Sequence, residues 1–347
     1  MIITRAPYRI SFFGGGSDYP AWFREEGGAV LSTSIDKYCY ISCRYLPPFF
    51  EVKNRIVWSR IEVTNTINEI VHPVVREGLK YLGFDDSFGF EIQHQGDLPA
   101  RSGVGSSSSF TVAFLKALTA LKGKVIQKHQ LALDAIELEQ KILRESVGSQ
   151  DQVAAAHGGL NRITFQRNSE ITVEPVTIPK SRILSLESNL MLFYTGTSRT
   201  ASEIASTVIE NLPKKKHALR EMMGMVDSAL SVLSSEGSLD GFGSLLHENW
   251  QLKRELSPMV TTAEVDLIYE TATKHGARGG KLLGAGGSGF MLFYVPIEKQ
   301  ASVRRALSKY LYVPFCFENQ GVTIVHYGSD FSDRNGYETK ALARGPE

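Results

Sequence analysis

The stretch Leu98-Pro-Ala-Arg-Ser-Gly-Val-Gly-Ser-Ser-Ser-Ser109 lies between two segments of different hydrophobic periodicity. Before it, Phe88, Phe90 and Ile92 alternate with small or polar residues, as in a half-buried strand. After it, apolar residues recur at helical spacing through 110–121. We therefore expect a tight turn that connects a strand to the first turn of an amphipathic helix, with the rest of the chain organised around it.

This turn has the chemistry of a phosphate-binding loop. Gly103 and Gly105 have no Cβ atom, so the backbone there can turn sharply and approach a ligand closely. The first amides of a helix lack intrahelical acceptors and lie at the positive end of the helix dipole. Ser106 to Ser109 add hydroxyl donors, and one or two of them offer an oxygen ligand for magnesium. We interpret the stretch as a cradle for a polyphosphate.

The main alternative is a flexible linker rich in glycine and serine. A linker is not expected to follow a strand and enter a helix directly, without a polar spacer, so the phosphate cradle is favoured. The stretch is not a Walker A loop, because no Gly-Lys-Ser/Thr follows. It is not a dinucleotide-binding fingerprint either, because no acidic residue closes a second strand.

The composition is that of a soluble globular protein. Its 347 residues suffice for one large or two ordinary domains, and we expect two, closely packed. The 38 basic and 37 acidic residues nearly cancel, which argues against nucleic acid and anionic membranes as partners. Cys39, Cys43 and Cys316 do not cluster, so neither disulfides nor a zinc site is expected. With no export signal and no membrane-length apolar run, we expect a cytoplasmic protein.

The order of the expected elements favours the α+β class. Strands are expected in 2–12 (interrupted by Pro7), 30–46, 56–63, 88–94, 160–178 (a hairpin), 190–194, 290–295 and 321–327. Helices are expected in 73–82, 110–121, 127–145, 201–234, 239–256, 261–275 and 298–311. Strands follow one another without regular helical alternation, which argues against a doubly wound sheet. The joint between the domains is expected at 179–186.

Four further polar or glycine-rich loops are candidates for a site. The first is Phe13-Gly-Gly-Gly-Ser-Asp-Tyr-Pro20, in which Asp18 has the alternative role of capping a turn. The second is Gly148-Ser-Gln-Asp-Gln152, which enters an alanine-rich helix and is equally explained as a capped helix start. In the third, Thr195 to Ser202, Arg199 is available to bind an anion, and a surface helix end is the alternative explanation. The fourth is the glycine cluster Lys281 to Gly289.

Together these loops resemble the signature motifs of the GHMP kinases, the family named for galactokinase, homoserine kinase, mevalonate kinase and phosphomevalonate kinase. Pro7 to Tyr19 is similar to the first motif, Leu98 to Ser109 to the second, ATP-binding motif, and Lys281 to Gly289 to the third. Their order and spacing cover nearly the whole chain. Three motifs in sequence are far more specific than any one of them.

Within the family, the chain is similar to bacterial D-glycero-D-manno-heptose 7-phosphate kinases and to L-fucose kinases. The residues that carry this similarity are the triple glycine before Ser17-Asp18, the segment 148–152, and Phe193 to Arg199. Galactokinase has Glu-His where this chain has Gly15-Gly16, which argues against galactose. The glycine loop and Arg199 suit a larger, phosphorylated sugar.

The resemblance implies a ribosomal-protein-S5-type N-terminal domain (1–183), a ferredoxin-like C-terminal domain (184–347) and a site between them. It implies Asp151 as the catalytic carboxylate and Arg9 as the basic residue that stabilises charge near the nucleophile or the transferring phosphoryl group. It implies Ser107 with Glu139 as magnesium ligands, with Ser106 or Ser108 as alternatives to Ser107. The implied ATP-binding residues are Pro99, Arg101, Gly103, Val104, Gly105, Ser106, Ser107, Ser108 and Ser109. The implied substrate-binding residues are Gly15, Gly16, Ser17, Asp18, Tyr19, Gln150, Arg199, Gly286 and Gly287.

The implied activity is transfer of the γ-phosphate of ATP, with magnesium, to the anomeric hydroxyl of heptose 7-phosphate. Two alternatives stay open: a kinase for an unphosphorylated sugar such as L-fucose or galactose, and a non-catalytic sensor of sugar and ATP. A sensor is expected to lose catalytic positions, yet Arg9, Asp18, Glu139 and Asp151 are all present. A mevalonate-type kinase would need a more apolar acceptor site. Protein partners leave no recognisable trace in the sequence.

Overall fold

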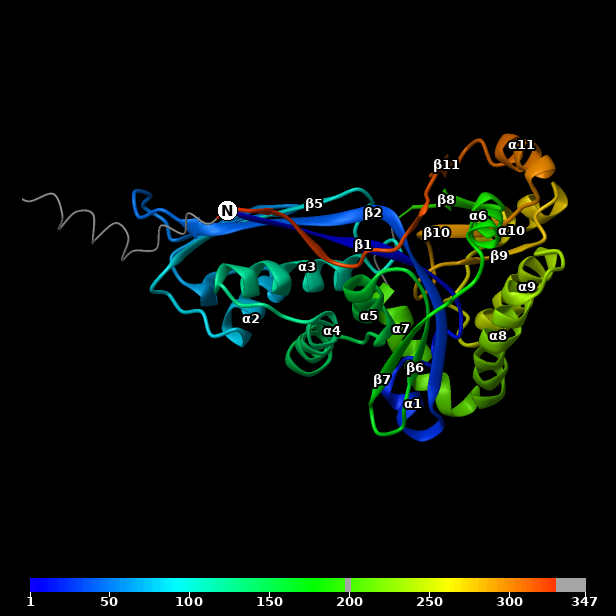
Figure 1. Cartoon of the computed structure of the whole chain (residues 1–347), viewed down its shortest axis with the longest axis horizontal. Helices are drawn as coiled ribbons and strands as arrows, with labels where there is room; N and C mark the ends of the chain where they lie inside the picture. Colours follow the sequence, from blue (N-terminus) through cyan, green and yellow to red (C-terminus); the bar gives the residue numbers. More distant parts are fainter. Residues whose placement is uncertain (197–200, 329–347) are drawn as a thin grey trace, which may run out of the picture.

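The computed structural model describes residues 1–196 and 201–328, which form two bodies side by side (Figure 1). The larger body is built on a nine-stranded mixed sheet with the order β13-β1-β2-β5-β3-β4. Strands β12 and β6 also pair with β2, and β7 pairs with β6. Its strands are β1 (Ile2–Phe13), β2 (Gly28–Leu46), β3 (Asn54–Val57), β4 (Ile61–Thr64), β5 (Gly89–Gly96), β6 (Leu160–Phe165), β7 (Ile171–Pro175), β12 (Phe317–Glu318) and β13 (Thr323–Tyr327).

Strand β2 organises the larger sheet because it pairs with different neighbours along its length. Residues 28–33 pair with β6, and residues 39–46 pair with β5, while β1 runs antiparallel along its other edge. In its second half Cys39, Ile41 and Cys43 are fully buried, and the residues between them are partly exposed. This alternation is the period of a strand with one face on the core.

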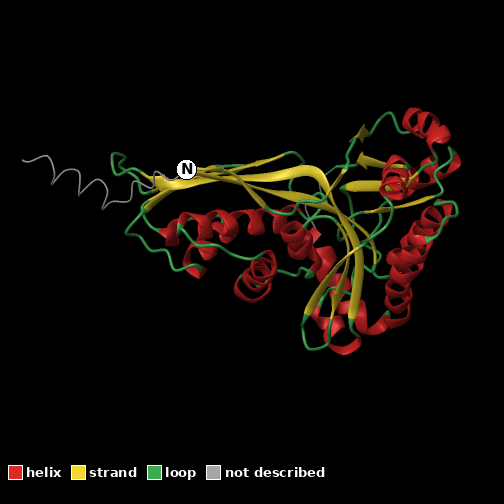
Figure 2. Ribbon diagram, in the orientation of Figure 1, coloured by secondary structure: helices red, strands yellow, loops and turns green. Residues whose placement is uncertain are grey.

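One face of this sheet is covered by helices (Figure 2). The covering helices are α2 (Pro73–Tyr81), α3 (Ser106–Leu121), α4 (Lys128–Ile136) and α5 (Gln150–His157), with α1 (Pro20–Glu26) at the far end of β2. A 3₁₀ turn (Ile67–Glu69) precedes α2, and a π-helical turn (Glu137–Ile142) extends α4. Helix α3 is buried almost all round, with Phe114 and Leu118 fully inaccessible. It is the central helix of this body.

The smaller body is built on an antiparallel four-stranded sheet with the order β11-β8-β10-β9. Its strands are β8 (Leu190–Tyr194), β9 (Gly279–Leu282), β10 (Phe290–Tyr294) and β11 (Leu311–Tyr312). Its helices are α6 (Lys180–Ser188), α7 (Ala201–Asn211), α8 (Lys216–Ser234), α9 (Asp240–Glu255), α10 (Ala263–Lys274) and α11 (Ile297–Ala306), with a 3₁₀ turn at Leu212–Lys214. Trp250 of α9 and Phe293 of β10 are fully buried in its core.

The α+β class and most expected elements are confirmed, with three local differences. Strand β1 continues through Pro7, where the register with β2 shifts, so proline does not interrupt it. The single strand expected at 56–63 is the hairpin β3–β4. The joint expected at 179–186 is largely helix α6, and the proposed boundary at residue 183 lies inside it.

The end of the described chain returns to the first sheet. Strand β13 pairs with β1 and β12 pairs with β2, so residues 317–327 belong to the larger sheet although they follow the smaller body in sequence. The assignment of residues 184–347 to one C-terminal domain therefore stays a prediction, and strands β12 and β13 pair with the sheet of the larger body. Within 1–196 and 201–328, no helix combines the length and the apolar character needed to cross a membrane.

Candidate active site

A cleft of about 610 Å³ lies between the two bodies. The first and second glycine loops and the start of α5 line it on the larger body, and α7, α8, α9 and the third loop line it on the smaller one. Of the sequence-predicted residues, the cleft brings together Arg9, Gly15, Gly16, Asp18, Tyr19, Arg101, Gly103, Gly105, Ser106, Ser107, Ser108, Gln150 and Asp151. Segments far apart in sequence thus converge on one cavity.

A bidentate ion pair joins β1 to α5 at this cleft. Arg9 is buried, and its Nε and one terminal nitrogen each donate to a carboxylate oxygen of Asp151 at 2.7 Å. The other terminal nitrogen donates to the carbonyl of Gly103 at 2.6 Å. The Asp151 side chain remains 23% exposed, so its carboxylate is held in one orientation but is still accessible from the cleft.

The phosphate cradle lies against this ion pair. Gly105 is the N-cap of α3 in the left-handed conformation (φ 75°), and a Cβ atom there would lie 3.3 Å from a carboxylate oxygen of Asp151. The first N–H groups of α3 therefore lie beside the Asp151 carboxylate, and they have no acceptor within the helix. A phosphate bound at this helix start would be close to the reactive group.

The second and third glycine loops pack backbone against backbone. A Cβ on Gly103 would lie 2.5 Å from the carbonyl oxygen of Leu283, and one on Gly284 would lie 2.4 Å from Gly103 Cα. A Cβ on Gly289 would lie 2.4 Å from the carbonyl oxygen of Ser102. Only glycine permits these approaches, so the two bodies meet at the cradle itself.

Asp18 connects the first glycine loop to the start of α5. Its carboxylate accepts from the amides of Gly16 (3.0 Å) and Gln150 (3.3 Å), and its own carbonyl accepts from the Ser149 amide (2.9 Å). Burial, and secondly the charge of Asp151, raise the pKa of Asp18. Its role as a turn cap is thus real, but it also lines the cleft.

Two buried oxygen atoms in the cleft have no hydrogen-bond partner among the described residues. They are Ser11 Oγ and Gln150 Oε1, and a Cβ on Gly15 would lie 3.7 Å from the first and 3.9 Å from Gln150 Nε2. Buried polar atoms without partners are costly, which favours a hydroxyl-bearing ligand beside the first loop. Ser11 was not expected from sequence, because a serine within a strand carries no distinguishing pattern.

Glu139 is fully buried in the π-helical turn rather than solvated. One of its oxygens accepts from Ser108 Oγ (2.9 Å) and Gln152 Nε2 (2.5 Å), and the other, Oε1, has no partner among the described residues. Burial raises the pKa of Glu139 to about 7. The serine that contacts it is Ser108, one of the alternatives, while Ser107 is exposed in the cleft. Glu139 is not among the described residues that line the cleft, but a carboxylate oxygen without a partner beside a serine hydroxyl fits a magnesium ligand.

Several predicted site residues stabilise the loops instead of lining the cleft. Ser17 Oγ donates to the carbonyl of Gly14 and accepts from the Ala29 amide, and it is fully buried. Ser109 Oγ donates to the carbonyl of Pro7, and Val104 is buried with its carbonyl accepting from the Arg9 amide.

The other predicted residues lie at the edge of the site. Pro99 is exposed, and its carbonyl accepts from Ser102 Oγ (2.6 Å). Gly286 and Gly287 pack against Val260, where the Gly287 amide donates to the Val260 carbonyl (3.0 Å), and they are not among the described residues that line the cleft. The third loop contributes Gly284 and Ala285 instead. Arg199 lies outside the described residues.

Two lysines in the cleft were not assigned a role from sequence. Lys253 of α9 and Lys281 of β9 are both buried and both line the cavity. Lys281 begins the third motif, and this position was a partial indication that it lies at the site. Lys253 lies in the amphipathic helix α9, where a lysine is ordinarily exposed to solvent.

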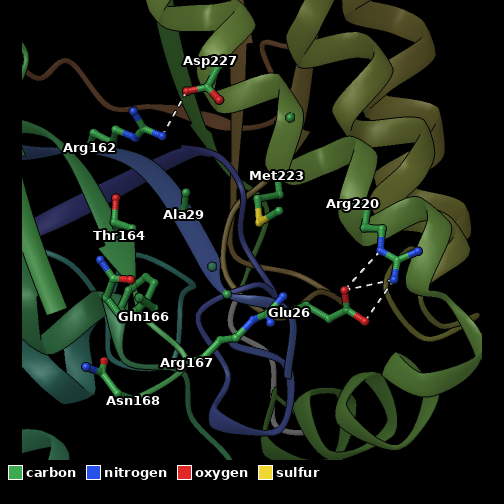
Figure 3. Close-up of a pocket in the computed structure, with 14 residues that line it drawn as sticks. Glu26, Ala29, Arg162, Thr164, Gln166, Arg167, Asn168, Arg220, Met223 and Asp227 are labelled. Atoms are coloured by element: carbon green, nitrogen blue, oxygen red, sulfur yellow. Dashed lines mark hydrogen bonds and ion pairs between the residues drawn. The ribbon is translucent and has the colours of Figure 1, made fainter. Parts of the chain in front are cut away.

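A second cavity, of about 620 Å³, lies between α1, the β6–β7 hairpin and α8 (Figure 3). Two of its arginines are paired with carboxylates: Arg220 contacts Glu26 at 3.0 Å, and Arg162 contacts Asp227 at 3.2 Å. Neither the phosphate cradle nor Asp151 lines it. The cleft between the two bodies is therefore the candidate active site.

Comparison with known proteins agrees with this geometry. The model of the GHMP kinases N-terminal domain matches residues 65–159, and that of the GHMP kinases C-terminal domain matches residues 228–313. The chain is 28% identical over 340 residues to D-glycero-alpha-D-manno-heptose 7-phosphate kinase of Campylobacter jejuni, covering 92% of this chain and 98% of that protein. It is 24% identical to bifunctional fucokinase/GDP-fucose pyrophosphorylase of Arabidopsis thaliana, covering 88% of this chain and 31% of that protein.

A solved structure extends the similarity to the whole fold. A D-glycero-D-manno-heptose 1-phosphate kinase from Bacteroides thetaiotaomicron has a TM-score of 0.71 and 26% sequence identity, covering 95% of this chain and 100% of that chain. The matched domains and the similar kinases define an ATP-dependent phosphotransferase that acts on a hydroxyl group. The chain belongs to the GHMP kinase family, as the three loops predict.

Proposed function

We propose that this GHMP kinase transfers the γ-phosphate of ATP to the anomeric hydroxyl of D-glycero-D-manno-heptose 7-phosphate. The observation that carries the chemistry is the Arg9–Asp151 pair, which fixes a carboxylate beside the phosphate cradle. The choice of acceptor is supported by the similarity over nearly the full length of the Campylobacter jejuni kinase. It is also supported by Gly15-Gly16, which present no side chain to a plain hexose.

The proposed roles follow from positioning and charge. Asp151 accepts the proton of the attacking hydroxyl, while Arg9 holds its carboxylate and offsets charge that develops nearby. The amides at the start of α3 and the Ser106 and Ser107 hydroxyls hold the phosphates. Asp18 and Gln150 orient the sugar. When bound, magnesium neutralises charge on the phosphate oxygens. Ser107 or Ser108, with the free oxygen of Glu139, would hold it.

The test is ADP release from magnesium ATP with a panel of acceptors: heptose 7-phosphate, mannose, L-fucose, galactose and mevalonate. Phosphorus NMR of the product gives the position of the new phosphate. We expect turnover confined to heptose 7-phosphate, with a new anomeric phosphate. Turnover on mevalonate alone, or none despite nucleotide binding, would overturn the proposal.

A kinase for unphosphorylated L-fucose is the second candidate. It is favoured by the similarity to the bifunctional fucokinase/GDP-fucose pyrophosphorylase of Arabidopsis thaliana, of which this chain spans about a third. In the same panel it predicts turnover on L-fucose that exceeds turnover on heptose 7-phosphate. The catalytic roles of Asp151 and Arg9 would then be unchanged, and only the acceptor assignment would be wrong.

Glu139→Gln is expected to weaken the response to magnesium without destabilising the protein. Glutamine retains an acceptor for Ser108 but removes the charged ligand oxygen. Because burial raises the pKa of Glu139 to about 7, the ionised form costs folding free energy above that pH, and a neutral side chain avoids the cost. We expect roughly tenfold more magnesium for half-maximal rate, and an unfolding temperature at pH 8 that is not lowered.

The matched control for this substitution is Glu137→Gln, two residues away and paired with Lys141 on the surface. It is expected to keep the wild-type magnesium dependence. If Glu139→Gln and Glu137→Gln had the same dependence as the wild type, Glu139 would not be a metal ligand.

Gly148→Ala is expected to weaken binding of the acceptor sugar selectively. The new Cβ would lie 1.9 Å from a carboxylate oxygen of Asp18, which must then leave the amides of Gly16 and Gln150. We expect KM for the acceptor to rise about tenfold, since hydrogen bonds to a charged group are lost, with little change in the dissociation constant of MgATP. Gly224→Ala, where no atom lies within 4 Å of the new Cβ, is the control. A larger effect on MgATP than on the acceptor would contradict this role.

A further inference from the structure

The wall of the cleft formed by the smaller body carries two buried ammonium groups. Lys253 Nζ donates to the carbonyls of Leu282 (2.8 Å) and Gly284 (2.6 Å). Lys281 Nζ donates to the carbonyl of Phe12 (2.8 Å) and to Asn249 Oδ1 (3.0 Å). An ammonium group has three N–H donors, so each lysine retains one for a further acceptor.

Neither ammonium group forms an ion pair with a carboxylate of residues 1–196 or 201–328. Their partners are neutral oxygens, which accept hydrogen bonds but do not cancel charge. The Lys253 side chain is 9% exposed and Lys281 is 3% exposed. A buried charge without a counter-ion is costly, and proteins ordinarily pair it. In the second cavity even the partly exposed Arg220 and Arg162 are paired with carboxylates, those of Glu26 and Asp227 (Figure 3).

The two lysines also repel each other and Arg9. Burial lowers the pKa of Lys253 to about 7, with the charge of Arg9 as a secondary cause. Burial also lowers the pKa of Lys281 well below its usual value, with the charges of Lys253 and Arg9 as secondary causes. When both lysines are protonated, three cationic groups line the cavity, and Asp151 is paired with one of them, Arg9. Repulsion among these charges destabilises the ligand-free protein, and an anion bound in the cavity would offset it.

We propose that Lys253 and Lys281 form a second phosphate-binding subsite, on the wall of the cleft that the smaller body contributes. Both side chains line the cavity, and each has an unused donor. The ligand is a tetrahedral phosphate group. It is either the phosphoryl group in transfer or the phosphate that the acceptor already carries, so the identity of the source rests on the proposed function.

The competing explanation is that the lysines only support the loops. Lys253 holds the carbonyl of Gly284, which packs on Gly103, and Lys281 holds the carbonyl of Phe12 at the end of β1. A purely structural role predicts a lower unfolding temperature when either lysine is replaced, with unchanged affinity for phosphate. A phosphate subsite predicts weaker phosphate binding and an unfolding temperature that is not lowered, because removing an uncompensated buried charge stabilises the ligand-free protein.

The experiment uses Lys253→Met and Lys281→Met, with exposed Lys124→Met as the control. Inorganic phosphate is the probe, and its affinity is measured by calorimetry and by the shift in unfolding temperature at increasing concentration. We expect the affinity for inorganic phosphate to fall about tenfold or more in both cleft variants and to stay at the wild-type value in the control. Wild-type affinity for phosphate in both cleft variants would overturn the proposal.

Lys253→Gln and Lys281→Gln guard against loss of folding, since they keep N–H donors for the neutral oxygens but lack the charge. If the methionine variants fail to fold, weak phosphate binding by the folded glutamine variants supports the subsite, and wild-type binding overturns it. This assay requires no turnover, so it succeeds or fails independently of the acceptor assignment.

Steady-state kinetics then identify the source of the phosphate. If the subsite holds the acceptor's own phosphate, the variants raise KM for heptose 7-phosphate but leave KM for the unphosphorylated heptose unchanged. If it holds the phosphoryl group in transfer, kcat falls with both acceptors. Both results support the subsite, and unchanged kinetics with every substrate would contradict it.

Discussion

Asp151→Asn is expected to lower kcat by about 10²- to 10⁴-fold, the range for loss of a positioned general base. Asparagine is nearly isosteric with aspartate and still presents an oxygen to Arg9, so the bidentate geometry becomes monodentate while the loops stay in place. It has no carboxylate to accept the proton of the attacking hydroxyl. The dissociation constant of MgATP should therefore change little, and single-turnover rates together with nucleotide titrations will separate the two effects.

Asp227→Asn is the matched control for this substitution. Asp227 also pairs with an arginine, Arg162, but in the second cavity (Figure 3). Its loss removes an exposed Arg–Asp pair that contributes little to stability. We expect wild-type turnover in this variant. Wild-type turnover in purified Asp151→Asn would instead show that Asp151 is not the catalytic carboxylate.

Gly103→Ala is expected to separate the second and third loops and to weaken nucleotide binding. Gly103 has φ 85°, a conformation that disfavours any side chain, and the new Cβ would lie 2.5 Å from the carbonyl oxygen of Leu283. The nearest atoms belong to the backbone of Leu283 and Gly284, so the clash can be relieved only if the loop moves. We expect MgATP affinity to fall tenfold or more and the free energy of unfolding to fall by roughly 1–3 kcal/mol. Calorimetry and chemical denaturation measure these quantities.

Gly123→Ala isolates the effect of the clash from that of the backbone conformation. Gly123 has φ 66°, and no atom lies within 4 Å of a Cβ at that position. It shares the cost of a positive φ but has no neighbour to displace, so it should lower stability slightly and leave MgATP binding unchanged. Equal losses of nucleotide affinity in the two variants would mean that loop contact is unimportant.

The cradle and the class of the fold were predictable from sequence because their signals are local. The glycines at 103 and 105 and the serines after them specify a turn and a helix start over a few residues. Alternation in β2 and helical spacing in α3 follow from which face each element buries. The three loops needed only their order and spacing to indicate one family, and the family models agree.

The partners of each side chain were decided by tertiary structure. Arg9 and Asp151 are 142 positions apart, and no local pattern states that they form a bidentate pair. Packing of the π-helical turn buries Glu139 beside Ser108, and packing of the two bodies turns Gly286 and Gly287 toward Val260. The sequence by itself determined at which positions glycine lets two backbone segments approach closely, and which reactive side chains the protein has. Burial and long-range contacts, which depend on how the sheets and helices pack, determined which groups face the cleft, including Ser11, Lys253 and Lys281.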